Sequence, residues 1–112
     1  MIKMIKNLNE LESEITQSLG VLVYFSNDVC NVGKALMPKI ELLVNEKFPR
    51  LNMVQVNTKE TPDISAQHMI FTVPCIVVYM GGKEFLRESR NISVEALSSK
   101  LEEVYKQLIG LL

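Results

Sequence analysis

The chain has 112 residues, of which 47% are hydrophobic and 22% are charged, and its formal net charge is −1. These values are typical of a globular protein with one core, so we expect a single domain over residues 1–112. The sequence has no basic block. This argues against nucleic acid or an acidic membrane surface as the main partner.

The sequence shows no pattern typical of export or of membrane insertion. The opening residues MIKMIK are too short for the apolar part of a secretory signal, and no apolar run approaches membrane-spanning length. We therefore expect a cytoplasmic location, where reducing conditions disfavour a disulfide framework. One histidine and two scattered cysteines make a zinc site improbable, so we expect no metal.

Hydrophobic periodicity and turn residues predict strands and helices that alternate along the chain. The predicted strands are Ile2–Ile5, Val21–Ser26, Met53–Asn57, Val73–Tyr79 and Lys83–Glu88. The predicted helices are one capped by Asn7 or Asn9 and ended by Gly20, one from about Asn31 to Phe48, one from Pro62 to about Met69, and one capped by Ser93.

This order predicts an α/β protein with one central sheet and helices on both faces. Strands separated by helices usually form parallel pairs with right-handed crossovers, so we expect parallel pairing there. Gly81–Gly82 predicts a tight hairpin turn that adds an antiparallel edge strand. The predicted sheet is therefore mixed.

Cys30 stands between the strand Val21–Ser26 and the helix that follows it. A cysteine at a helix N-terminus is close to unpaired backbone N–H groups and to the positive end of the helix dipole. Both stabilise a thiolate, which is the reactive form of cysteine. We interpret Cys30 as a nucleophile; the alternative is a small residue at the end of a loop.

Three landmarks together resemble the thioredoxin family over about Leu8–Tyr105. They are the strand, loop, cysteine and helix with Lys34 and Pro38; Val73-Pro74 at the place of the family's cis-proline; and the Gly81–Gly82 hairpin. The resemblance implies the thioredoxin fold, a three-layer α/β/α structure with the order β-α-β-α-β-α-β-β-α.

The active-site motif departs from the family pattern. Thioredoxins carry Cys-Gly-Pro-Cys, whereas this chain reads Cys30, Asn31, Val32 and Gly33. The attacking cysteine remains and the resolving cysteine is replaced by glycine. Only the first step of disulfide reduction is then possible within the motif, and release needs an external thiol.

The resemblance also assigns residues around the motif. The family's buried aspartate and its neighbouring lysine correspond here to Tyr24 and Gln55. This chain therefore lacks both charges as well as the resolving thiol that they would assist. Val73 and Pro74 are expected to shape the groove that receives the partner. Arg90 replaces a groove glycine, where it would stabilise the thiolate or hold a carboxylate. The alternative for Arg90 is a solvated loop residue.

Cys75 and His68 are the remaining residues that could take part in the chemistry. Because strand residues alternate between faces, Cys75 should point away from Cys30 if Pro74 faces it, which favours a buried, inert thiol. The alternative is a second thiol that forms a bridge or relay with Cys30. His68 is the only histidine, and we see no reason for it to face Cys30.

The sequence thus predicts a thioredoxin-like thiol–disulfide exchange protein that acts by a monothiol mechanism in cytoplasmic redox homeostasis. Its expected partners are protein disulfides or thiols, with a low-molecular-weight thiol as the reductant. No cofactor is expected beyond a mixed disulfide with a small thiol. The alternative is a redox-inactive binding or adaptor module that uses the same groove for a protein partner.

Overall fold

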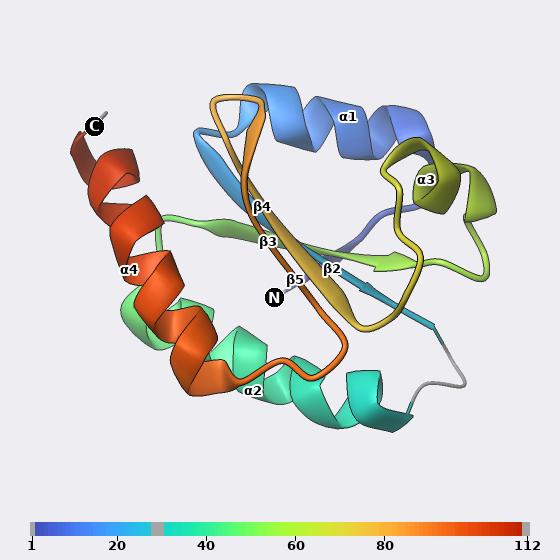
Figure 1. The fold of residues 1–112 in the computed structure, drawn as a ribbon. Helices are drawn as coiled ribbons and strands as arrows, with labels where there is room; N and C mark the ends of the chain where they lie inside the picture. Colours follow the sequence, from blue (N-terminus) through green and yellow to red (C-terminus); the bar gives the residue numbers. More distant parts are fainter. Residues whose placement is uncertain (1, 28–30, 111–112) are drawn as a thin grey trace.

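A computed structural model describes residues 2–27 and 31–110, apart from the side chains of residues 31 and 32. These residues form a five-stranded sheet with helices on both faces (Figure 1). The strands are β1 (Lys3–Met4), β2 (Gly20–Ser26), β3 (Asn52–Asn57), β4 (Cys75–Met80) and β5 (Lys83–Ser89). The helices are α1 (Leu8–Gln17), α2 (Asn31–Lys47), α3 (Pro62–Gln67) and α4 (Val94–Gly110).

The sheet order is β1-β3-β2-β4-β5, and the sheet is mixed, as predicted. β1 and β2 run parallel to β3, whereas β4 is antiparallel to both β2 and β5. The expectation of parallel pairing between strands separated by helices is therefore wrong for β4.

The direction of β4 follows from where the chain re-enters the sheet. Asn57 at the end of β3 pairs with Ser26, and Cys75 at the start of β4 pairs with Phe25 beside it. β4 thus begins at the sheet end where β3 finishes. From that end it can only run back along β2, which makes it antiparallel to β2.

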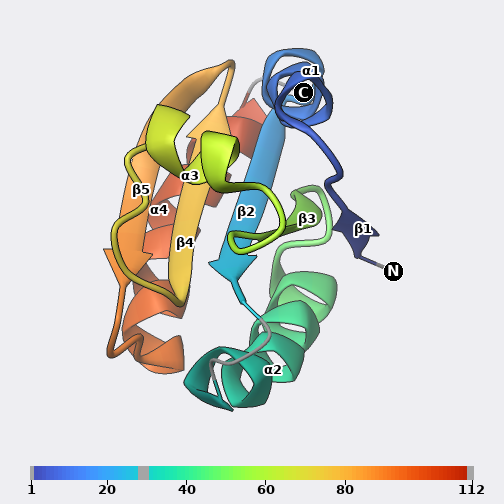
Figure 2. The ribbon, with the colours of Figure 1, turned by 90° about the vertical axis from the view of Figure 1, so that its right-hand side faces the viewer.

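Alternation along the strands divides the core into two halves. Leu22 and Tyr24 face the half that also contains α2 and α4, whereas Val23, Phe25 and Cys75 face the half that contains α1 and α3. Figure 1 shows α2 and α4 on one side of the sheet and α1 and α3 on the other, and Figure 2 shows α3 in front of β4 with α4 behind it. This division decides which side chains can reach α2.

The predicted end of the first helix needs correction. Asn7 is the N-cap and accepts a 2.8 Å hydrogen bond from the Glu10 N–H, but α1 ends at Gln17. Gly20 does not end it; it is the first residue of β2. A Cβ at Gly20 would lie 2.9 Å from Leu51 Cδ2 and 3.0 Å from Leu108 Cδ2, so a side chain there would displace these leucine side chains.

Over the described residues, no helix combines the length and the apolar character needed to cross a bilayer.

Candidate active site

Cys30 lies outside the described residues, so the candidate site is described through the elements around it. β2 ends at Ser26, and α2 begins at Asn31, the residue that follows Cys30 in the sequence. Val32 and Gly33 belong to the first turn of α2. The strand predicted before the cysteine and the helix predicted after it are therefore both present.

Tyr24 connects the central strand to the first turn of α2. Its side chain is fully buried, and its hydroxyl donates a 2.7 Å hydrogen bond to the buried backbone carbonyl of Gly33. Tyr24 also belongs to the same core cluster as Leu36 and Ile40 of α2. Two of the positions at which the sequence departs from the dithiol pattern, 24 and 33, are thus in direct contact.

Val73, Pro74 and Arg90 lie together at the start of β4. The Val73–Pro74 peptide bond is cis, Pro74 is buried, and its carbonyl accepts a 3.0 Å hydrogen bond from the Arg90 N–H. The Arg90 side chain is exposed. Arg90 and Leu36 of α2 line the same surface hollow, so the loop after β5 reaches the side of α2.

Arg90 has a φ of 64°, in the left-handed region that favours glycine. We expect Arg90→Gly to stabilise the fold by about 0.5–1 kcal/mol, because relief of about 1–2 kcal/mol of backbone strain exceeds the entropic cost of glycine. Chemical denaturation measures this change. Arg90→Ala is the matched control, since it removes the charge but keeps the strain. Equal stability of both variants would show that backbone conformation is not the cause.

Cys75 lies in the core half opposite α2. Only 2% of its surface is exposed, and its thiol is free. Burial raises its pKa above the ordinary value, and the positive charge of Arg87 offsets this only in part. At neutral pH, Cys75 is therefore a neutral, shielded thiol with little nucleophilic form.

His68 belongs to a polar cluster that the sequence analysis missed. Its Nε2 lies 2.8 Å from Glu12 Oε1, and its Nδ1 lies 3.0 Å from Tyr79 Oη. Burial, with the nearby Glu84 charge, raises the pKa of Tyr79 to about 12. The cluster joins α1, the end of α3 and β4 on the face opposite α2. No local pattern could reveal it, because its members are far apart in the sequence.

The fold and the site together identify the class of protein. A mixed sheet lies between two helix layers, a helix begins directly after a cysteine, and a cis-proline precedes β4. The family model described as Thioredoxin matches residues 3–103. The chain therefore belongs to the thioredoxin family, whose general chemistry is thiol–disulfide exchange on protein disulfides.

Similar proteins agree with this assignment. The chain is 30% identical to the thioredoxin-like protein YdfQ of Bacillus subtilis over 104 residues, covering 93% of this chain and 92% of that protein. It is 31% identical to thioredoxin 1 of Chlorobaculum tepidum over 68 residues, covering 61% of this chain and 67% of that protein.

Solved structures show the same fold. Plasmodium falciparum thioredoxin matches with a TM-score of 0.78 at 20% identity, over 95% of this chain and 98% of that chain. Mitochondrial thioredoxin 3 of Saccharomyces cerevisiae matches with a TM-score of 0.77 at 23% identity, over 95% of this chain and 94% of that chain. The α/β class and the thioredoxin fold predicted from the sequence are confirmed.

Proposed function

We propose that the protein is a monothiol thiol–disulfide exchange protein of the cytoplasm, with Cys30 as its nucleophile. The main support is the contact between Tyr24 and Gly33. The position of the second thiol holds a glycine whose carbonyl is hydrogen-bonded to a buried tyrosine. Because no thiol stands there, a motif disulfide between residues 30 and 33 cannot form.

The proposed reaction needs two equivalents of a small thiol for each disulfide reduced. The Cys30 thiolate attacks one sulfur of a protein disulfide, forms a mixed disulfide and releases the other sulfur as a thiolate. A small thiolate then attacks the Cys30 sulfur, releases the reduced protein and leaves the small thiol on Cys30. A second small thiolate frees Cys30 and forms the small disulfide. The two small thiols thus supply the two electrons.

In this proposal the groove residues position the partner beside Cys30 and take no part in the electron transfer. The backbone of Val73, before Pro74, pairs with the extended chain of the partner, while Asn31 and Val32 border the nucleophile. Arg90 lies at the rim, where its guanidinium attracts carboxylates of a peptide or a small thiol. Cys75 takes no part, because it is buried on the opposite side of the sheet from α2.

The proposal is tested by reduction of insulin disulfides with and without added glutathione. We expect turnover only with glutathione, loss of turnover in Cys30→Ser, and full turnover in the matched control Cys75→Ala. Glutathione-dependent turnover no faster than the uncatalysed reaction would contradict the proposal. Undiminished turnover in Cys30→Ser would contradict it as well.

A binding module is the second candidate, and one observation favours it. Phe71 is 86% exposed and Met69 is 62% exposed, both just before Val73–Pro74. Beside the proposed groove, these two side chains offer a protein partner apolar surface to pack against. In this case Cys30→Ser would retain partner binding while the wild-type protein shows no reductase turnover under either condition.

A further inference from the structure

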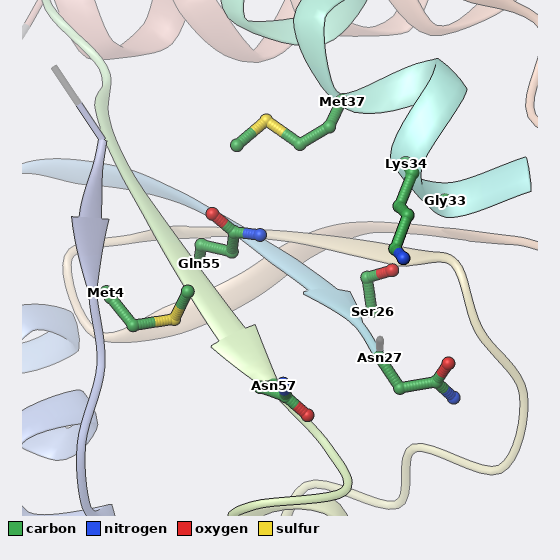
Figure 3. Close-up of a pocket in the computed structure, with 8 residues that line it drawn as sticks. All are labelled: Met4, Ser26, Asn27, Gly33, Lys34, Met37, Gln55 and Asn57. Carbon is green, nitrogen blue, oxygen red and sulfur yellow. The ribbon is translucent and has the colours of Figure 1, made fainter. Parts of the chain in front are cut away.

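A small cavity lies beneath the first turns of α2, on the β1–β3 side of the sheet (Figure 3). Its volume is about 130 Å³. Ser26, Lys34 and Gln55 contribute polar groups to its wall, and Met4 and Met37 contribute thioethers. The cavity is separate from the Pro74 and Arg90 region, which lies toward β4 and β5.

The sheet register brings the polar groups together. Gln55 pairs with Tyr24, and Ser26 is two residues beyond Tyr24 in β2, so all three side chains project toward α2. Lys34 approaches the same space from the helix, and Figure 3 shows its ammonium above the Ser26 hydroxyl. Three groups that can donate hydrogen bonds therefore converge from three elements.

These donors have no partner within the part of the chain that the structure describes. The Ser26 hydroxyl makes no hydrogen bond there, although the residue is only 6% exposed. Lys34 has no ion pair and the Gln55 amide no hydrogen bond with described residues. Among the described residues, only the Ser65 hydroxyl is a fully buried side-chain polar atom without a partner, so the Ser26 hydroxyl is open to the cavity, where a ligand can accept its hydrogen bond.

The residues that line the cavity indicate the charge, the apolar character and the size of a ligand that would fit. Among the described residues, the cavity wall includes one cation and no carboxylate, which suits a single negative charge. The thioethers of Met4 and Met37 offer adaptable apolar contact to a short hydrocarbon chain. The volume is close to that of an engineered cavity of about 150 Å³ that binds benzene, so about six non-hydrogen atoms fit.

We propose that this cavity binds a short-chain aliphatic carboxylate. The carboxylate accepts hydrogen bonds from Lys34, Ser26 and Gln55, and its hydrocarbon chain packs against Met4 and Met37. This site does not depend on Cys30 or on the proposed redox function.

Titration of the full chain with sodium butyrate, followed by NMR, tests the proposal. We expect saturable shifts of the backbone signals of Ser26, Lys34 and Gln55. Butyramide has the same shape without the charge, so it should bind at least about tenfold more weakly, the loss of one charged contact. Phosphate should also bind more weakly, because it has no hydrocarbon chain.

Three variants locate the site. Lys34→Met should weaken butyrate binding about tenfold and Ser26→Ala several-fold, as expected for loss of a charged and a neutral hydrogen bond. Lys39→Met is the matched control on the exposed face of α2 and should leave binding unchanged. Absence of saturable binding, binding unaffected by Lys34→Met, or phosphate binding as tight as butyrate would overturn the proposal.

Discussion

Treatment of the native protein with 2-hydroxyethyl disulfide is expected to add one small thiol to Cys30 and none to Cys75. The thiolate is the attacking species, and burial both shields Cys75 and raises its pKa. Cys75 should react only when the core opens, at least about 100-fold more slowly than Cys30. Mass spectrometry of the intact protein and of its peptides measures both rates.

Two controls make this labelling experiment decisive. Native Cys30→Ser should gain no adduct, and both cysteines of the wild-type protein should react in denaturant. Labelling of native Cys75 at the rate of Cys30 would show that Cys75 is an accessible second thiol. No adduct on Cys30, under conditions that modify a free cysteine peptide, would contradict its assignment as the nucleophile.

Tyr24→Ala is expected to destabilise the protein by about 3–5 kcal/mol, the usual cost of deleting a fully buried aromatic side chain. Two losses add in this variant. Deletion of the ring removes its packing against α2, and the hydrogen bond to the Gly33 carbonyl is lost. Urea denaturation with a two-state fit measures the free energy of unfolding.

Tyr24→Phe separates these two losses, because it keeps the ring and removes only the hydroxyl. We expect a cost of about 1 kcal/mol for the hydrogen bond alone. Phe25→Leu, on the opposite face of the same strand, controls for general loss of strand packing. If Tyr24→Phe is as stable as the wild type, the Gly33 contact does not hold the first turn of α2.

Most of the secondary structure could be predicted from local patterns. The helix predicted from about Asn31 to Phe48 is observed at Asn31–Lys47, and the strand predicted at Val73–Tyr79 is observed at Cys75–Met80. The strand begins later because a proline has no N–H to donate to a neighbouring strand. Periodicity and capping are properties of neighbouring residues, so they can be recognised without a structure.

The candidate site could be predicted only in part. The motif Cys30–Gly33 and the change at Tyr24 are visible in the sequence, and the sequence predicts that one thiol of the usual pair is absent. That the Tyr24 hydroxyl donates to the Gly33 carbonyl could not be foreseen. A hydrogen bond between a strand and a helix depends on their distance and orientation, which no local pattern contains.

The sequence by itself determined the family, the alternation of strands and helices, and the single cysteine of the motif. The tertiary structure alone decided the antiparallel direction of β4, the contact between Tyr24 and Gly33, and the cavity lined by Lys34 and Gln55. The physical reason is the range of the interactions. Helix and strand preferences act between near neighbours, whereas strand direction and cavity walls arise where distant segments pack together.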